Sequence, residues 1–163
     1  MMTRRFFLNS GVAALTFLSL AGRMGFARAA AQAFEVTHTE EEWKKILNAD
    51  QFAVLRKAAT ERPGSSPLLN EHRRGTFGCA GCQLDLFDST TKFESGTGWP
   101  SFWKPLDNAV LSDKDTSYGM IRTAVNCRRC GGHLGHVFDD GPKPTGLRYC
   151  MNGTAMTFKP IAA

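Results

Sequence analysis

Five cysteines are the residues of this 163-residue chain whose types and spacing are best suited to chemistry. Four of them form two Cys-x-x-Cys pairs, and the fifth, Cys150, stands alone. Four thiolates are the number that a tetrahedral structural zinc ion requires. The pairs therefore predict one Zn²⁺ bound by Cys79, Cys82, Cys127 and Cys130. Because a closed four-cysteine site cannot also be a reaction centre, Cys150 is left as a candidate nucleophile.

Both interpretations have alternatives. The paired cysteines could form two disulfides if the protein is exported, although a bridge within Cys-x-x-Cys is strained. The 44 residues between Cys82 and Cys127 exceed the roughly 15–20 of a compact zinc ribbon, so the metal would join distant parts of one domain. Cys150 could be a small buried hydrophobic residue. Arg148 and Asn152, each two residues from it, place a positive charge and an amide nearby and favour a nucleophile.

The first 33 residues are typical of an export signal. Arg4 and Arg5 precede an apolar run, Gly11 to Gly22, which is shorter than the about 20 residues of a permanent membrane anchor. Ala27-Arg28-Ala29 and Ala31-Gln32-Ala33 fit the A-x-A pattern of signal cleavage. The paired arginines resemble a bacterial twin-arginine signal, which exports folded proteins and would allow zinc to be loaded in the cytoplasm. A Sec signal or a short N-terminal anchor is the alternative.

We therefore expect a twin-arginine signal peptide over residues 1–33, a single domain over residues 34–163, a periplasmic location and no stable membrane anchor. The whole chain has 20 basic and 15 acidic residues, a net charge of +5. Four of the basic residues and none of the acidic ones lie in residues 1–33, so the domain has 16 basic against 15 acidic residues, a net charge of +1. This balance gives little support to a nucleic-acid partner.

Helices are expected only at the start of the domain. Thr39 and Glu42 form a capping box, and Asp50 could cap a second short helix that ends before Pro63. The apolar face of the first helix would consist of Trp43, Ile46 and Leu47.

Short apolar segments separated by glycine, proline and aspartate follow these helices and predict a mainly antiparallel β-domain. The segments are 76–77, 84–87, 110–111, 119–125, 136–138, 147–151 and 156–158.

Two further clusters contain residues suited to binding or catalysis. Residues 95–103 are rich in glycine and then in aromatic residues, so Trp99 either packs behind a turn or presents its indole to an apolar ligand. His133 and His136 follow the second cysteine pair. Because four cysteines already complete a zinc site, these histidines are available for proton transfer or for hydrogen bonds to a substrate.

In this order, the clusters resemble the B-type methionine sulfoxide reductases, which act on the R epimer. The matching segments are Cys79-x-x-Cys82, 95–102 (SGTGWPSF), Cys127-x-x-Cys130, 133–138 (HLGHVF) and 148–152 (RYCMN), and the resemblance covers roughly residues 38–160. It implies a mainly β fold of two small antiparallel sheets with short N-terminal helices and a four-cysteine structural zinc site.

The resemblance also implies roles for individual residues. The catalytic group would be Cys150 as nucleophile with His133, His136 and Asn152 on the polar side of the pocket. The substrate-binding residues would be Trp99, which contacts the substrate methyl group, and Arg148, which lies near the nucleophile.

The sequence departs from the family pattern at three positions. Thr97 stands where many members have a resolving cysteine, so a sulfenic acid on Cys150 would need an external thioredoxin-like or small-thiol reductant. Ala124 and Gly153 replace residues that are more often Glu and Ser, which would alter local hydrogen bonding. We expect a monomer whose substrates are oxidised proteins that carry methionine-R-sulfoxide.

The residue types suit this reaction. A sulfoxide sulfur is electrophilic only when its oxygen is protonated or strongly hydrogen-bonded as the S–O bond breaks, so the site needs a thiolate and a proton donor. Cys150 would attack sulfur, and His133 or His136 would protonate oxygen. The products would be methionine and a sulfenic acid on Cys150.

Two other classes of function remain possible on the sequence. A zinc-ribbon binding module would use exposed aromatic residues to bind single strands or a partner protein, but would leave Cys150 without a role. A periplasmic disulfide oxidoreductase would use both Cys-x-x-Cys pairs for redox chemistry. A zinc assay with a free-thiol count separates these hypotheses, because the reductase predicts one metal ion and one reactive thiol.

Overall fold

The structure is a computed structural model that describes residues 33–161, so the predicted signal peptide lies almost entirely outside the described residues. Two helices come first, α1 (Glu40–Ile46) and α2 (Ala49–Lys57). The strands that follow are β1 (Gly75–Cys79), β2 (Asp85–Asp88), β3 (Lys92–Phe93), β4 (Ser101–Phe102), β5 (Val110–Asp115), β6 (Arg122–Cys127), β7 (His133–Phe138), β8 (Arg148–Met151) and β9 (Met156–Pro160). The 3₁₀ turns are η1 (Pro67–Asn70), η2 (Ser89–Thr91), η3 (Ser117–Gly119) and η4 (Gly153–Ala155).

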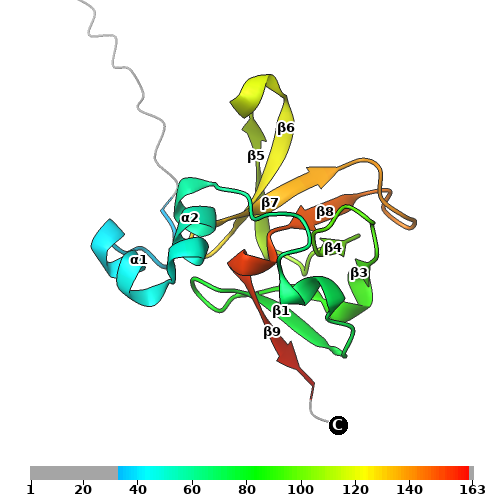
Figure 1. Cartoon of the computed structure of the whole chain (residues 1–163), viewed down its shortest axis with the longest axis horizontal. Coiled ribbons are helices and arrows are strands. Elements are labelled where there is room, and N and C mark those ends of the chain that lie inside the picture. Colours follow the sequence, from blue (N-terminus) through cyan, green and yellow to red (C-terminus); the bar gives the residue numbers. More distant parts are fainter. Residues whose placement is uncertain (1–32, 162–163) are drawn as a thin grey trace, which may run out of the picture. The chain divides into compact units, whose positions relative to one another are not determined.

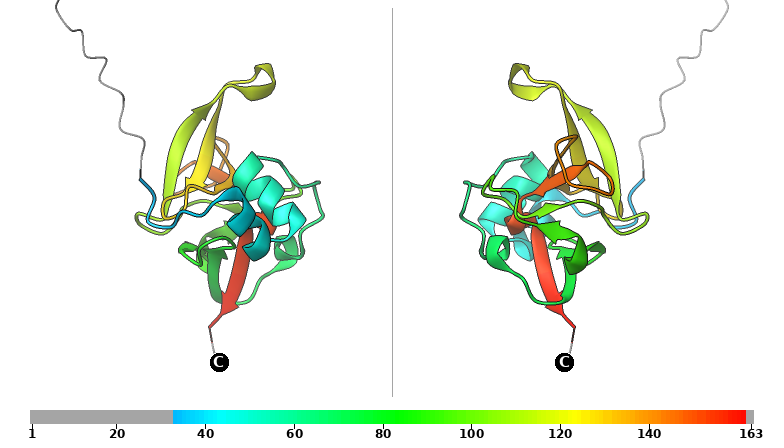
Figure 2. Two further views of the ribbon diagram at one scale, coloured as in Figure 1. Left: turned by 90° about the vertical axis from the view of Figure 1, so that its left-hand side faces the viewer. Right: turned by 90° about the vertical axis from the view of Figure 1, so that its right-hand side faces the viewer.

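The strands form two antiparallel sheets, which confirms the predicted mainly β fold. One sheet has the order β2-β1-β9, and the other has the order β3-β4-β8-β7-β6-β5. The β5–β6 hairpin reaches beyond the other strands at one end of the described domain, and β9 runs toward the other end (Figures 1 and 2). In residues 33–161, no helix is long and apolar enough to cross a membrane.

The two helices begin where polar side chains cap them. Thr39 and Glu42 form the predicted capping box at α1. The cap of α2 is Asn48, which forms a second capping box with Gln51, so the prediction that Asp50 caps this helix was wrong. Asp50 lies in the first turn instead, where its negative charge favours the helix dipole.

The apolar face of α1 was predicted only in part. Trp43 and Leu47 are buried, whereas Ile46 is 52% exposed. Ile46 is the last residue of the helix, and Trp43 is the buried residue within it.

All seven apolar segments contribute to strands, but the sequence did not predict β3 and β4. These strands have two residues each, too few to show an alternating pattern. They exist because β4 pairs with β8 in the sheet, and β3 pairs with β4.

Three aromatic rings join the two sheets. Phe77 and Phe87 come from the three-stranded sheet, and Phe102 comes from β4 of the larger one. The rings of Phe87 and Phe102 stack with centroids 4.3 Å apart, and Phe77 meets Phe102 edge-on at 4.9 Å. All three side chains are fully buried, so β4 is held in place by the core although it is short.

Candidate active site and metal centre

The four paired cysteines come together in space. Their sulfur atoms all lie within 4.8 Å of one another. The Sγ atoms of Cys79 and Cys130 are 3.7 Å apart, and those of Cys82 and Cys127 are 3.5 Å apart. A tetrahedral zinc site with Zn–S bonds of about 2.3 Å has sulfur atoms about 3.8 Å apart. Disulfide sulfurs are about 2.05 Å apart, so the cluster fits a metal ion and not two disulfides.

Both Cys-x-x-Cys turns have the same backbone hydrogen bonds. After each second cysteine, the next residue donates its N–H to the carbonyl of the first: Gln83 to Cys79 at 2.9 Å and Gly131 to Cys127 at 2.8 Å. Gln83 and Gly131 both have positive φ angles, 60° and 67°. Two copies of one turn therefore face each other, each presenting two sulfur atoms.

The helices pack over this cluster. A Cβ atom on Gly81 would lie 3.5 Å from the Trp43 ring and 3.6 Å from Leu55, and a Cβ atom on Gly132 would lie 2.8 Å from Leu55. The guanidinium of Arg56 donates to the carbonyl oxygen of Cys130 at 3.0 Å. The cysteine cluster thus joins the N-terminal helices to turns at the ends of both sheets.

Cys150 lies apart from the cluster, in the middle of the larger sheet. On β8 it pairs with His136 of β7 on one side and with Ser101 of β4 on the other. Paired residues of antiparallel strands point to the same face, so these three side chains lie side by side. A Cβ atom on Gly135 would lie 2.2 Å from the backbone oxygen of Cys150, and glycine therefore allows β7 to approach β8 closely.

Most of the predicted site residues line one pocket of about 120 Å³ at Cys150. Trp99, His136 and Asn152 all lie on its wall. The other lining residues were not predicted from the sequence; they are Thr60, Arg122, Gly135 and Phe138. The size and mixed polarity of this pocket suit a short side chain with one polar atom.

Glu61 holds two of these side chains. Its carbonyl oxygen accepts a hydrogen bond from the indole N–H of Trp99 at 3.2 Å, and its N–H donates to the Asn152 side chain at 3.0 Å. Its carboxylate accepts hydrogen bonds from the N–H groups of Gly153 and Thr154 at 2.6 and 2.9 Å. Asn152 also donates to a backbone carbonyl at 3.1 Å, so its amide mainly positions the backbone around the pocket.

The Cys150 thiol has a raised pKa although polar neighbours act to lower it. Burial raises its pKa above the usual range, although Thr97 and the charge of Arg148 act in the opposite direction. The guanidinium of Arg148 donates two hydrogen bonds of 2.8 Å to Asp140 and lies 4.4 Å from the centre of the Phe138 ring. Much of the positive charge of Arg148 is therefore neutralised by Asp140.

His136 is held by a carboxylate. Its Nε2 lies 2.8 Å from Asp115, which also accepts hydrogen bonds from Arg122 at 2.6 Å and from the Ser117 N–H at 2.8 Å. These contacts, the Ser117 hydrogen bonds first, hold the pKa of Asp115 well below its usual range. Because a carboxylate only accepts hydrogen bonds, Nε2 of His136 carries a proton, and Nδ1 is the ring nitrogen left for the pocket.

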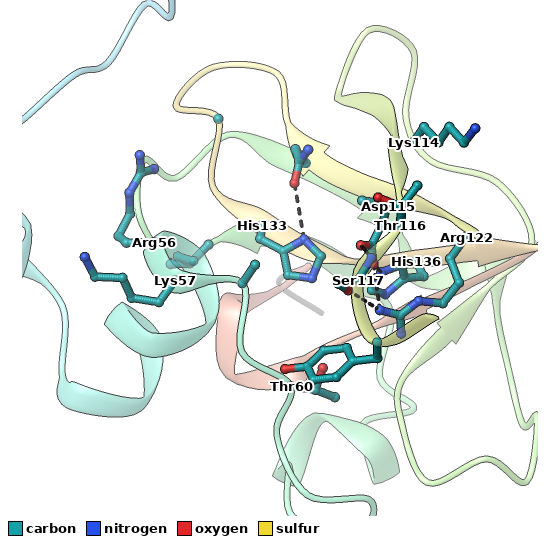
Figure 3. A pocket seen from close by; sticks show the side chains of 16 residues that line it. Arg56, Lys57, Thr60, Lys114, Asp115, Thr116, Ser117, Arg122, His133 and His136 are labelled. Carbon is teal, nitrogen blue, oxygen red and sulfur yellow. Dashed lines mark hydrogen bonds and ion pairs between the residues drawn. The ribbon is translucent and has the colours of Figure 1, made fainter. Parts of the chain in front are cut away.

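His133 lies in an adjoining groove of about 840 Å³, not on the wall of the Cys150 pocket. The groove and the pocket share Thr60, Arg122 and His136, and Figure 3 shows His133 and His136 on neighbouring parts of the groove. Their ring centroids are 5.3 Å apart.

His133 is kept neutral. Burial lowers its pKa to about 4. The side-chain N–H₂ of Asn126 donates to Asp113 at 2.9 Å, so the amide oxygen of Asn126 faces Nδ1 of His133 at 3.3 Å and requires a proton there. Nε2 of His133 is buried, has no hydrogen-bond partner among residues 33–161 and carries no proton in this tautomer.

The structure gives local reasons for two departures from the family pattern. A Cβ atom on Gly153 would lie 1.9 Å from the Ser66 hydroxyl, so Ser66 occupies the space that a serine side chain at 153 would need. Ala124 lies opposite His136 across the β6–β7 ladder, and Asp115 supplies the carboxylate beside that histidine.

Sequence reasoning missed Glu61 and Asp115 because neither belongs to a pattern of catalytic residues. Glu61 lies two residues before the turn at Pro63, and Asp115 ends a strand that carries alternating charges. Each is far in sequence from the residue it holds, and only the fold brings them together.

Comparison with known proteins gives one consistent family. A family model described as the SelR domain matches residues 47–160. The peptide methionine sulfoxide reductase MsrB of Pseudomonas putida strain W619 is 53% identical over 127 residues, which are 77% of this chain and 96% of that protein. The MsrB of Bradyrhizobium diazoefficiens is 54% identical over 127 residues, 77% of this chain and 91% of its own length. The MsrB of Methanosarcina barkeri is 54% identical over 125 residues, 76% and 88% of the two chains.

Proposed function

The chain belongs to the SelR family of B-type methionine sulfoxide reductases and reduces the R epimer of methionine sulfoxide, and from this we propose how its own residues carry out the reaction. The observation that carries the proposal is the pocket at Cys150, whose wall combines one thiol, one carboxylate-bound histidine and one indole. A thiol nucleophile with an acid beside it is what sulfoxide reduction requires.

We assign the proton donor to His136. Its Nε2–H is held by Asp115, which orients the ring and stabilises the imidazolium form, and Nδ1 is free to exchange a proton with groups in the pocket. In our proposal, neutral His136 takes the proton of the Cys150 thiol at Nδ1. It then gives that proton to the sulfoxide oxygen as the Cys150 thiolate attacks sulfur.

The step balances in atoms and electrons. The thiolate, the sulfoxide and one proton give the sulfenic acid of Cys150 and a thioether. The sulfur of Cys150 is oxidised by two electrons, and the methionine sulfur is reduced by two. His133, which is neutral and has no proton on Nε2, would orient the site and would not act as the acid.

Trp99 would recognise the substrate methyl group. Its indole N–H is already bound by Glu61, so the ring offers its apolar surface to the pocket. When the methyl group lies against the indole and the oxygen points toward His136, the two epimers exchange the positions of the lone pair and the rest of the methionine, so only one epimer can direct its polypeptide out of the pocket. This arrangement is our proposed basis for selecting the R epimer.

Oxidised proteins are the proposed substrates, and the adjoining groove gives room for the polypeptide on one side of the oxidised methionine. The groove opens from the Cys150 pocket between the end of α2 and the η3 turn (Figure 3). Tyr118 in that turn is 88% exposed and lines the groove, so it can pack against a substrate chain.

An external thiol would regenerate the enzyme. In the described residues the other four cysteines are held together in the cluster, and Thr97 is the residue beside Cys150. A thioredoxin-like protein or a small thiol would attack the sulfenic acid, release water and form a mixed disulfide. A second thiol would then restore the Cys150 thiol and leave as a disulfide.

We propose Zn²⁺ as the ion of the cysteine cluster. Four thiolates with no open position suit structural zinc, which would tie the helices to both sheets. When bound, the ion would supply folding energy and no chemistry.

We also propose that residues 1–33 are a twin-arginine signal and that the protein, as a monomer, acts in the periplasm. Arg4 and Arg5 before an apolar run, and two A-x-A sites, support this proposal. The match to the family begins at residue 47, after this segment. Replacing Arg4 and Arg5 by lysine should retain the protein in the cytoplasm, and N-terminal sequencing of the exported protein should begin near residue 34.

The test of the function is anaerobic incubation of the protein with the separate R and S epimers of a blocked methionine sulfoxide. We expect one equivalent of methionine from the R epimer without added reductant, and none from the S epimer. Reduction of the S epimer at a similar rate would contradict the proposed roles of Trp99 and His136.

A further inference from the structure

A chain of hydroxyl groups ends at the sulfur of Cys150. The Ser101 hydroxyl donates to the carbonyl oxygen of Trp99 at 3.1 Å and lies 2.7 Å from the Ser95 hydroxyl. The Ser95 hydroxyl lies 2.8 Å from the Thr97 hydroxyl, which lies 3.8 Å from Sγ of Cys150. Ser101 is fully buried, so one end of the chain is protected from water.

The carbonyl at the far end fixes the direction of these hydrogen bonds. A carbonyl oxygen only accepts, and each hydroxyl has one proton to donate. The Ser101 proton therefore goes to Trp99, the Ser95 proton to Ser101 and the Thr97 proton to Ser95. The Thr97 oxygen is then left to accept a hydrogen bond from the S–H of Cys150. The chain is complete only when Cys150 is a protonated thiol.

When Cys150 loses its proton, its sulfur changes from a hydrogen-bond donor to an acceptor. A thiolate only accepts hydrogen bonds, so Thr97 must turn its proton from Ser95 to Cys150. The Ser95 oxygen keeps a donor, because the backbone N–H of Thr97 lies 3.4 Å away. The exchange trades a hydrogen bond between neutral groups for one to a charged sulfur, which is about twice as strong.

The charged and titratable groups around Cys150 are mainly bound to carboxylates. Arg148 of β8 is bound to Asp140, and Arg122 and His136 of β6 and β7 are bound to Asp115. Hydrogen bonds from Arg148 and Ser101 also lower the pKa of Cys150, but the hydrogen bond from Thr97, at 3.8 Å, lowers it more than either of them.

We propose that Thr97 is a catalytic residue whose hydroxyl accepts a hydrogen bond from the resting Cys150 thiol and turns to donate one to the thiolate that attacks the sulfoxide. This inference rests on Cys150 being the nucleophile of the proposed function. It gives the position of the absent resolving cysteine a role in the first step of the reaction.

The test compares Thr97→Val, which keeps the shape of threonine without its hydroxyl, with Thr97→Ser, which keeps the hydroxyl. The first readout is the rate of alkylation of Cys150 by iodoacetamide as a function of pH, on zinc-loaded protein. The second is the single-turnover rate with a blocked methionine-R-sulfoxide. We expect Thr97→Val to slow both about tenfold at pH 7, since a hydrogen bond to a charged group is lost, and Thr97→Ser to restore most of the rate.

Ser95→Ala provides the decisive contrast. Without the Ser95 oxygen, Thr97 loses its alternative acceptor, and its proton is free for the thiolate. We expect this variant to be alkylated faster than the wild-type protein, by a few-fold, whereas damage to the loop would slow alkylation in both variants.

Two results would overturn the inference. One is wild-type alkylation and single-turnover rates in Thr97→Val with its zinc retained. The other is slowing of both Thr97→Val and Ser95→Ala to a similar extent, which would make the hydroxyls part of the scaffold. Failure of the wild-type protein to reduce the R epimer would instead count against the proposed function, since alkylation does not depend on turnover.

Discussion

The same residue type has two different environments in this molecule. Four cysteine sulfurs lie within 4.8 Å of one another between two turns of identical hydrogen bonding, under the helices. Cys150 lies in a strand, beside a pocket, with a hydroxyl as its hydrogen-bond neighbour. A sulfur surrounded by three others is a metal ligand, whereas a sulfur surrounded by hydroxyl, imidazole and indole groups can react. The surroundings of each cysteine, and not its residue type, determine whether it stabilises the fold or takes part in the reaction.

The largest effect should come from a change in the cluster. Cys79→Ser should leave the protein unfolded or nearly so, because structural zinc contributes on the order of 10–16 kcal/mol of apparent binding free energy, similar to the whole stability of a domain. Zinc content and circular dichroism measure this outcome. A Cys79→Ser protein that is folded, free of metal and active at the wild-type rate would show that the cysteine cluster is not a structural metal site.

The matched change at the other sulfur should do the reverse. Cys150→Ser should abolish reduction of the R epimer while zinc content and thermal unfolding remain those of the wild-type protein, since a hydroxyl is a far weaker nucleophile at neutral pH. Single-turnover assays, which need no recycling thiol, provide the measurement. Residual turnover above one part in a thousand would point to another nucleophile.

The two histidines sharpen the description of the reactive region. His136→Ala should lower the single-turnover rate by about 10²–10⁴-fold, the usual contribution of a general acid. His133→Ala should have a smaller effect, because His133 lies in the groove and has no proton to give from Nε2. His72→Ala, a change at a side chain that is 67% exposed, is the control. The opposite order of the two effects would show that the acid is His133.

A second sulfur beside Cys150 should change how the sulfenic acid is resolved. The wild-type protein, treated with one equivalent of substrate and a sulfenic-acid trap, should carry one adduct on Cys150 and retain its zinc. Thr97→Cys should instead form a disulfide with Cys150, because the side chain at 97 already lies 3.8 Å from that sulfur. Mass spectrometry distinguishes the products. In the wild-type protein, a disulfide between Cys150 and a cluster cysteine, with loss of zinc, would mean that the two regions exchange electrons.

The smallest predicted effect is on stability at mildly acidic pH. The pKa of His133 falls from 6.5 to about 4 on folding, so the unfolded chain binds a proton more readily between these values. Stability due to neutral His133 is therefore present above pH 6.5 and is lost as the pH falls toward 4. Between pH 7 and pH 5.5 the loss should be about 1 kcal/mol.

Denaturant midpoints of the wild-type protein and of His133→Gln at the two pH values measure this loss. The variant lacks the titrating group and should lose less stability. Equal losses in the two proteins would show that His133 titrates normally.

Much of the fold and of the site could be predicted from the sequence. Features that depend on neighbours along the chain were predicted correctly. They are the capping box at Thr39, the segments that form the longer strands, and the paired cysteines. The cap of α2 was predicted two residues too late, at Asp50 instead of Asn48, because several polar residues near a helix start can serve as caps. Strands β3 and β4 were missed because two residues carry no periodicity.

By itself, the sequence determined the types of chemistry available: four thiols for a metal, one thiol for a reaction, and two histidines that could supply a proton. Only the tertiary structure decided between His136 and His133, because Asp115 and Asn126 select the tautomer of each ring across the sheet. It also placed Glu61 under Trp99 and the hydroxyl of Thr97 against Cys150. Residue types follow from the chain, but hydrogen-bond direction and burial depend on partners that are distant in sequence, and these set which group holds a proton.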